Sequence, residues 1–291
     1  MKNLPIALVE REAGISKDVL RVWERRYGFP LPQRDAHGDR RYGPEQIEKL
    51  KLIKQLMGRG HRPAKIVPLA TTELSALLTQ DTSGDEREPS RFAEEVMALL
   101  KAANHSGLVA TLTQKLASDG LMSFVVEQLA PLNGVIGHAW AQGKISIAQE
   151  HLYTEAIQKI LRAYLQNLRS NQGTPKILLA TLPGEQHGLG LLMVECVISA
   201  AGAAAISLGT EVPIQEIAVA AHSHRCDAVA ISFSRARSAS FVSQGVKGLR
   251  DLLDQKTELW IGGDGAGWLR QPIAGVLHFA DLRSIHDRLN K

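Results

Sequence analysis

The spacing of apolar positions along the chain changes at two places. Residues 1–78 have helical spacing with one interruption rich in Gly and Pro, and residues 79–89 are polar and carry no aliphatic side chain. From residue 90 to 172 the helical spacing continues, which predicts four helices packed as a bundle. From residue 173 to 291 short β-rich runs alternate with helical stretches, which predicts a parallel, doubly wound sheet. Three domains are therefore expected, with residues 79–89 as a linker.

Five short runs of aliphatic and β-branched residues are the expected strands of the last domain. They are residues 176–181, 203–208, 228–233, 258–261 and a weaker run at 276–279, with helices expected at 189–200, 214–223 and 238–254. Alternation of strands and helices is typical of a Rossmann-like α/β domain.

The N-terminal domain begins with a helix-turn-helix pattern. Residues 6–13 and 16–28 are expected helices, with Ser16 as the N-cap of the second helix and Gly28 as its end. The second helix is expected to have a core-facing side with Val19, Leu20 and Trp23, and an outward side with Arg21, Glu24, Arg25 and Arg26. A recognition helix that enters a major groove has this arrangement.

Basic charge is concentrated in the same domain. Residues 1–79 contain 15 Lys and Arg against 9 Asp and Glu, a balance of +6, whereas the remainder contains 19 against 21. Residues 32–43 read as a Gly-turned hairpin with three arginines, and a further helix is expected at 45–57. A basic segment of this kind indicates a nucleic-acid-binding module.

The remaining composition excludes several classes of protein. With only two cysteines, Cys196 and Cys226, a disulfide scaffold and a cysteine-based zinc site are not expected. Residues 1–12 lack a signal-peptide core and no run of 18 apolar residues occurs. A cytoplasmic protein with no membrane partner is therefore expected.

The loop after the first strand of the α/β domain carries candidate metal chemistry. It contains Glu185, His187, Gly188 and Gly190, and it lies at the carboxyl end of a parallel strand, where open α/β folds bind ligands. Glu185 can accept the imidazole N–H of His187, which fixes the tautomer and makes the histidine a good metal ligand. The two glycines leave room for a large group near the backbone. A phosphate loop is excluded because no Lys-Ser/Thr pair ends the loop.

Residues 1–78 resemble the MerR-family winged helix. The resemblance is carried by the sequence V-L-R-V-W-E-R-R-Y-G at residues 19–28, and by R-R-Y at 40–42 followed by Ile47. It implies an all-α winged helix-turn-helix domain that contacts double-stranded operator DNA through Arg21, Arg25, Arg26, Tyr27, Arg34, Arg40, Arg41 and Tyr42.

The loop sequence E-x-H-x-x-G at residues 185–190 resembles the motif of the cobalamin-binding domain. Companion motifs are L-G-x-x-V-P at residues 208–213 and the pair Gly262-Gly263. Ser232 stands at the serine position of the S-x-L motif, whose leucine is not kept. The resemblance implies that His187 is the lower axial cobalt ligand, and that the residues around the cofactor and its nucleotide tail include Glu185, Gly188, Gly190, Ser232, Gly262 and Gly263.

The helical block adds Trp140, followed after nine residues by Glu150 and His151. Ser146 and Gln149 read as a capping box at the start of the second helix, so these three residues come from adjacent helix ends. The pattern resembles the CarH/LitR group of regulators, which use adenosylcobalamin as a light sensor. By resemblance, Trp140 covers the upper face of the corrin, and Glu150 and His151 contact the adenosyl group.

One position departs from this group. A histidine directly follows the tryptophan in the better-known pattern, whereas Ala141 stands here, and His138 lies two positions before Trp140 on the expected helix. The upper cobalt ligand after photolysis is therefore left open.

The resemblance implies a light-responsive repressor without catalytic residues. Adenosylcobalamin holds it in the dark as an operator-bound homo-oligomer, a tetramer, and photolysis of the Co–C bond releases the DNA. Three alternatives remain: a cobalamin-binding regulator that does not respond to light, a regulator that no longer binds the cofactor, and a corrinoid enzyme. The last is disfavoured by the DNA-binding domain and the lack of a substrate barrel.

Overall fold

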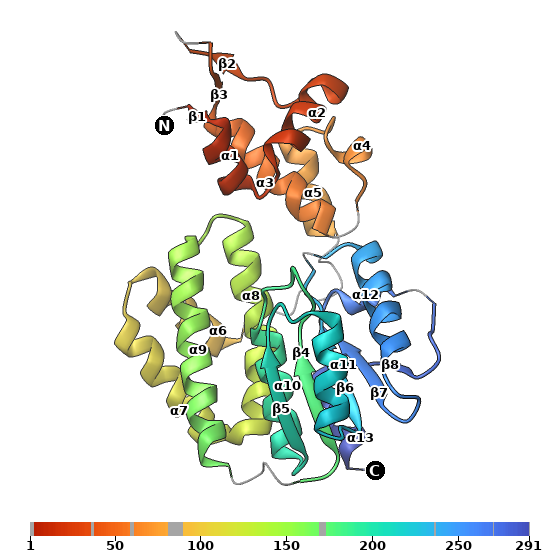
Figure 1. Ribbon diagram of the computed structural model, residues 1–291. Coiled ribbons are helices and arrows are strands. Elements are labelled where there is room, and N and C mark those ends of the chain that lie inside the picture. The colour runs from red at the N-terminus through yellow and green to blue at the C-terminus, as the bar shows by residue number, and fades with distance from the viewer. Residues whose placement is uncertain are drawn as a thin grey trace. The chain divides into compact units, whose positions relative to one another are not determined.

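The computed structural model describes residues 3–35, 38–58, 61–80, 90–168, 173–235, 237–269 and 271–290. The chain forms two compact units, Met1–Glu88 and Pro89–Lys291 (Figure 1). The last described helix of the first unit continues through Gln80, two residues beyond residue 78. Residues 81–89 of the expected linker lie outside the described residues.

The first unit combines helices with a small antiparallel sheet. The helices are α1 (Ile6–Ala13), α2 (Lys17–Tyr27), α3 (Pro44–Gly58), α4 (Pro63–Ile66) and α5 (Thr71–Gln80). The expected hairpin forms β2 (Gln33–Arg34) and β3 (Arg40–Tyr42), and β1 (Leu4–Pro5) pairs with the other edge of β3. A helix-turn-helix with an attached hairpin is therefore present.

Local signals set the ends of α2 as expected. The Ser16 hydroxyl accepts a hydrogen bond from the Val19 backbone N–H, and Gly28 ends the helix with a left-handed φ of 66°. Leu20 and Trp23 are buried, but Val19 is 37% exposed. The expectation that Val19 faces the core was wrong, because α2 packs on the core through a narrower stripe.

The second unit begins with the helical bundle. It consists of α6 (Arg91–Lys101), α7 (His105–Ser123), the π-helical turn η1 (Phe124–Leu129), α8 (Ala130–Ala141) and α9 (Ile147–Asn167). Gly120 has a φ of 76° and kinks α7 just before the π-helical turn. The Ser146–Gln149 capping box at the start of α9 is confirmed.

The parallel sheet follows the bundle. Its strands are β4 (Lys176–Ala180), β5 (Ala204–Gly209), β6 (Ala228–Ser232), β7 (Glu258–Gly262) and β8 (Val276–His278), in the order β5-β4-β6-β7-β8. The helices are α10 (Leu189–Ala200), α11 (Ile214–Ser223), α12 (Ala239–Leu252) and α13 (Leu282–Leu289), with the 3-10 turn η2 (Ala266–Trp268). Every neighbouring strand pair is parallel, which confirms the Rossmann-like expectation.

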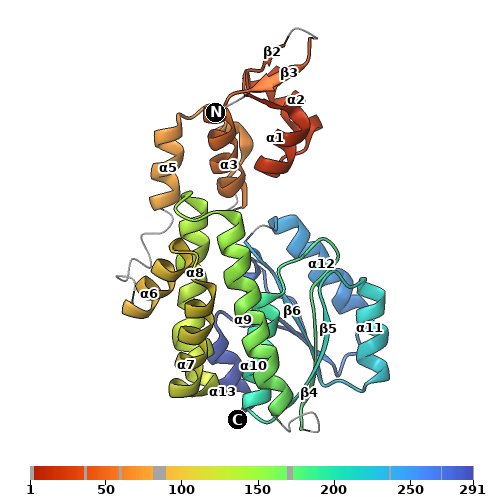
Figure 2. The same ribbon diagram turned by 90° about the vertical axis from the view of Figure 1, so that its left-hand side faces the viewer.

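The two faces of this sheet have different covers. Alternate residues of β4, such as Ile177 and Leu179, join the core that includes α10, α13 and the bundle, whereas Leu178 joins the core under α11 and α12. Figure 2 shows the bundle helices on the α10 side of the sheet, with α11 and α12 on the opposite side. The bundle and the sheet therefore share one continuous core, and the loops above the strand ends lie beside the bundle.

Candidate functional site

The loop between β4 and α10 lies at the point where the order of the strands in the sheet reverses. β4 pairs with β5 on one side and with β6 on the other. The chain therefore leaves β4 toward one edge of the sheet and returns past it to β6. In open α/β sheets, ligands bind at this switch point, outside the carboxyl ends of the strands. Glu185 and His187 lie in this loop, as expected.

The His187 side chain is held by the Glu185 carboxylate. Its Nδ1 lies 2.6 Å from Glu185 Oε1, and its backbone N–H donates to the same oxygen at 3.2 Å. The His187 side chain is 62% exposed, whereas that of Glu185 is fully buried. Because Nδ1 is engaged by the carboxylate, Nε2 keeps its lone pair and is the nitrogen available to a metal ion.

Ser234 is a partner of Glu185 that the sequence reading missed. Its backbone N–H and its hydroxyl donate to Glu185 Oε2 at 3.0 and 2.8 Å, and Arg237 Nε lies 3.4 Å from the same oxygen. Ser232, which was expected among the cofactor contacts, ends β6, and its hydroxyl would lie 3.1 Å from a Cβ at Gly190. The signal available in the sequence was the second serine of the Ser-Phe-Ser run after this strand.

These contacts set the charge state of the buried carboxyl. Burial alone would raise the pKa of Glu185, but the hydrogen bonds from His187 and Ser234 outweigh burial and lower the pKa from 4.5 to about 2. Glu185 is therefore ionised at neutral pH, and it acts only as a hydrogen-bond acceptor toward the imidazole.

The loop after β5 supports the first loop from the side. The Thr181 hydroxyl donates to the Glu185 carbonyl oxygen and accepts from the Glu211 backbone N–H at 3.0 Å. The Gln186 side chain donates to the Glu211 carboxylate at 3.2 Å. The L-G-x-x-V-P segment thus fixes the backbone that carries Glu185 and His187.

The glycines of the site let neighbouring segments of the chain pack closely at the strand ends. A Cβ at Gly188 would lie 3.1 Å from the Thr210 methyl, and one at Gly190 would lie 3.1 Å from the Ser232 hydroxyl. Gly263 has a φ of 85°, and a Cβ there would lie 2.5 Å from the Phe233 carbonyl oxygen. Gly262 pairs with Ser232 across the two central strands. An exposed imidazole nitrogen beside this glycine-lined strand edge fits a corrinoid that takes one axial ligand from the protein.

The other expected cofactor contacts come from facing helix ends of the bundle. Trp140 lies in the last turn of α8 and is 45% exposed, whereas Glu150 and His151 lie in the first turn of α9. His151 Nδ1 lies 2.6 Å from Glu150 Oε2, and Thr154, which the sequence reading missed, donates to Glu150 Oε1 at 2.9 Å. Three polar or aromatic groups are therefore presented at one end of the bundle.

Neither Ala141 nor His138 identifies the upper cobalt ligand. Ala141 is the last residue of α8, and its side chain lies outside the described part of the chain. The Nε2 atom of His138 lies 2.6 Å from the side-chain nitrogen of Gln142. The position after Trp140 therefore offers no imidazole, as the sequence indicates.

The arginines expected to contact DNA differ in their pairing. Arg21 pairs with Asp18, Arg40 with Glu24 and Arg41 with Asp35, at distances of 3.2, 3.1 and 2.9 Å. The guanidinium of Arg26 lies over the ring of its neighbour Tyr27, and Arg34 donates to the Gly38 carbonyl oxygen. Arg25 is exposed and forms no ion pair with the described part of the chain.

Tyr42 requires a correction. It was expected to contact the duplex from the hairpin, but its side chain is fully buried and its hydroxyl has no hydrogen-bond partner among the described residues. Burial raises the pKa of this phenol. Tyr42 and Arg40 share one face of β3, where Tyr42 enters the core and Arg40 reaches Glu24, whereas Arg41 lies on the other face.

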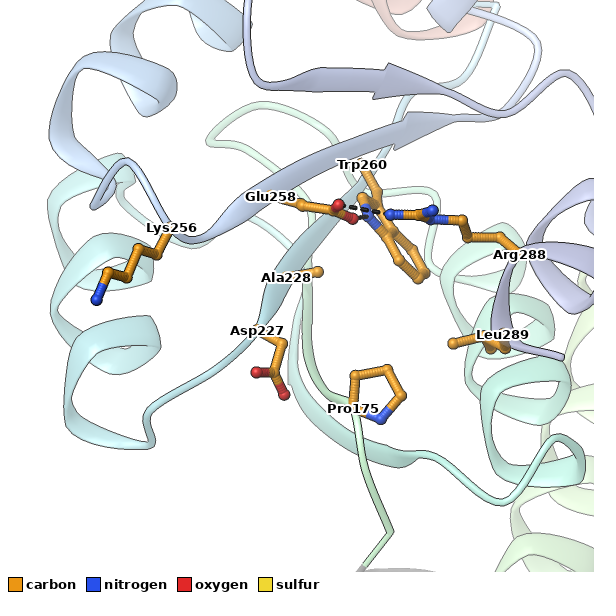
Figure 3. Close-up of a pocket in the computed structure, with 8 residues that line it drawn as sticks. All are labelled: Pro175, Asp227, Ala228, Lys256, Glu258, Trp260, Arg288 and Leu289. Atoms are coloured by element: carbon orange, nitrogen blue, oxygen red, sulfur yellow. Dashed lines mark hydrogen bonds and ion pairs between the residues drawn. The ribbon is translucent and has the colours of Figure 1, made fainter. Parts of the chain in front are cut away.

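A cavity of about 320 Å³ lies at the amino ends of the strands, whereas His187 follows the carboxyl end of β4. Figure 3 shows the Glu258 carboxylate next to the Trp260 ring and Arg288. The carboxylate accepts hydrogen bonds from Arg288 at 2.6 Å and from the Trp260 indole N–H at 2.7 Å. Most of the lining residues precede or belong to strands β4, β6 and β7, and Arg288 and Leu289 come from α13. Glu258 pairs with Arg288, and none of the lining residues belongs to the candidate site.

Both cysteines are free and buried, which confirms that they form no disulfide. Burial raises the pKa of the Cys196 thiol to about 12 and also raises that of Cys226. We expect neither thiol of the native protein to react with a disulfide reagent at pH 8 within minutes, and both to react in guanidinium chloride. The reaction is followed by the absorbance of the coloured thiolate that the reagent releases. Rapid release of one equivalent of this thiolate per native chain would contradict the prediction.

Within the described residues, no helix is both long enough and apolar enough to cross a membrane.

Residues 4–72 match the family model "MerR HTH family regulatory protein" and residues 91–164 match "B12 binding domain". The second match covers most of the bundle, which carries Trp140, Glu150 and His151.

Two curated proteins of Myxococcus xanthus are similar to most of the chain. The HTH-type transcriptional repressor CarH is 29% identical over 262 residues, covering 87% of this chain and 86% of CarH. The HTH-type transcriptional repressor CarA is 28% identical over 237 residues, covering 81% and 78%. Among solved structures, the monomethylamine corrinoid protein of Methanosarcina barkeri has a TM-score of 0.53 at 16% identity, covering 66% of this chain and 94% of that one, which supports the fold alone. The chain therefore combines a MerR-type helix-turn-helix domain with a B12 binding domain, and over most of its length it is similar to the repressors CarH and CarA.

Proposed function

We propose that the chain is a light-responsive transcriptional repressor that binds operator DNA as an adenosylcobalamin-dependent oligomer in the dark. The observation that carries the cofactor part is the His187 imidazole, fixed through Nδ1 by a buried carboxylate and exposed at Nε2. The MerR-type domain and the similarity to two repressors support the DNA part. When bound, the cofactor supplies a cobalt–carbon bond that light can break.

The proposed cofactor contacts form two groups, one on the lower face of the corrin ring and one on its upper face. His187 would hold the cobalt from below, with Glu185 fixing its tautomer and Gly188 and Gly190 admitting the corrin edge. The nucleotide tail would run past the facing strand ends that carry Ser232, Gly262 and Gly263. Trp140 would cover the upper face, and Glu150 and His151 would contact the adenosyl group.

Regulation then follows from the number of DNA-binding units in one assembly. Each chain supplies one helix-turn-helix, and an oligomer, a tetramer by resemblance, brings several of them to one operator. Linking the binding units raises the effective concentration of the second and later ones, so affinity rises without new contacts. Loss of the adenosyl group would leave Trp140 and the α9 N-terminus without their partner, and the assembly would separate.

An operator gel shift with and without adenosylcobalamin, in the dark and after illumination, tests the whole proposal. We expect a strong shift only with the cofactor in the dark, and a drop in apparent affinity of at least about tenfold after green or blue light. Hydroxocobalamin, which has no adenosyl group, is the control and should resemble the illuminated sample. Equal binding in all samples would reject cofactor dependence.

A second function, sensing of cobalamin supply without a response to light, is favoured by Ala141, which stands where the better-known pattern has a histidine. Gel filtration of the loaded protein before and after illumination separates the two. A decrease in mass after light supports the photoreceptor, whereas an unchanged mass with cofactor-dependent DNA binding supports the supply sensor.

A further inference from the structure

One exposed apolar residue stands among the arginines of α2. Val22 is 42% exposed, and helical geometry places it nearly opposite Leu20 and about 100° around the helix from Trp23. Arg21 and Arg25 lie beside it and are also exposed. A β-branched residue at an exposed helix position adds little to packing and has a lower helix propensity than a straight-chain residue. Folding therefore gives no reason for valine at this position.

The charge around Val22 indicates what can cover it. Asp18, Val22 and Arg25 follow one another at a spacing of four and three residues, so they form one stripe along the helix. Arg21 is paired with Asp18 at 3.2 Å, and Arg25 has no carboxylate partner in the described part of the unit. With the excess of basic residues in this unit, the stripe fits a polyanion that has an apolar group within reach.

The major groove of DNA meets both requirements. Phosphates line its two sides, where arginines bind them, and the 5-methyl group of thymine is the apolar group on the base edges that face the groove. A helix inserted with its outward stripe toward the bases brings its central side chains to these edges. The ion pair between Arg40 and Glu24 joins α2 to β3, which holds the helix in a fixed orientation to the hairpin.

Building on the proposed function, we infer that Val22 is a specificity-determining residue that contacts the 5-methyl group of one thymine in the operator. Arg25, next to it on the stripe, contacts the phosphates or a guanine edge of the same groove. Cytosine lacks the methyl group and presents an amino group, so the contact selects thymine over cytosine at that position.

The test uses the full-length protein with adenosylcobalamin in the dark, and a duplex selected by this protein from a random-sequence pool. Each thymine of the selected duplex is replaced in turn by deoxyuridine, which removes only the methyl group. We expect one position at which this replacement weakens binding about threefold to tenfold, the range for one buried methyl group. In Val22→Ala the same replacement should have no effect.

Val19→Ala is the matched control, since Val19 is a second exposed valine one turn earlier on α2. It should retain the thymine–deoxyuridine difference at the Val22 position. Thermal unfolding checks that both variants are folded, as expected for exposed side chains. If Val22→Ala loses affinity at the same deoxyuridine positions as the wild type, the inference is overturned but the proposed function is not. Failure to select any sequence would overturn the proposed function and the inference together.

Discussion

The His187→Ala variant is expected to fold normally and to lose tight cobalamin binding. The side chain is 62% exposed and its one polar contact is with Glu185, so removing it opens no large cavity in the core. Loss of a residue that only orients a metal ligand costs about 10- to 100-fold in metal affinity, so loss of the ligand itself should cost at least about 100-fold.

The measurement is equilibrium dialysis with adenosylcobalamin, together with the absorption spectrum of the bound fraction. Free imidazole added to the variant should restore part of the nitrogen-ligated spectrum, because the missing side chain leaves room for it beside Glu185. His222→Ala is the control, since His222 is exposed on α11 and pairs with Asp254 away from the loop. A variant that binds cobalamin with wild-type affinity and spectrum would show that His187 is not the ligand.

Local features of this fold were predictable because they depend on neighbours in sequence. Ser16 and Gly28 bound α2, and the Ser146–Gln149 capping box starts α9, as their residue types require. The alternation of strands and helices likewise predicted the parallel sheet and placed the His187 loop at a strand end. In each case the interacting groups lie within four residues, or the pattern repeats along the chain.

Features that depend on distant partners were not predictable. Ser234 reaches Glu185 across 49 positions, and nothing local distinguishes it from Ser232. The burial of Tyr42 depends on which face of β3 packs on the helices, so its sequence position within R-R-Y suggested a DNA contact that the fold does not allow. The π-helical turn Phe124–Leu129 buries Phe124, Val125 and Leu129, and no composition signal marks it.

The Glu185→Gln variant is expected to lose both stability and cofactor binding. The carboxylate accepts hydrogen bonds from two groups of His187 and two groups of Ser234. An amide can replace only one of its two oxygens as an acceptor. Its NH₂ group must then face either the Ser234 backbone N–H or the His187 imidazole. The first arrangement leaves buried donors unpaired, at about 1–3 kcal/mol, which corresponds to a decrease in Tm of roughly 2–10 °C.

The second arrangement affects the metal site directly. An amide N–H that donates to His187 Nδ1 moves the imidazole proton to Nε2, and the nitrogen that should face the cobalt then has no lone pair. We therefore expect cobalamin affinity to fall about 10- to 100-fold. Glu211→Gln is the matched control, because Glu211 accepts from Gln186 in the neighbouring loop but does not contact His187.

Acidification separates the structural loss from the ligand effect. Since the pKa of Glu185 is lowered from 4.5 to about 2, its ionised form stabilises the folded protein above pH 4.5. This contribution decreases as the pH falls toward 2, because the carboxyl is protonated in the unfolded chain before it is in the folded one. The difference in unfolding free energy between the cofactor-free wild type and Glu185→Gln should therefore shrink in that range, as chemical denaturation at several pH values would measure. A difference that is constant with pH would mean that the ionised carboxylate is not what holds His187, and the imidazole would then need another group to fix its tautomer.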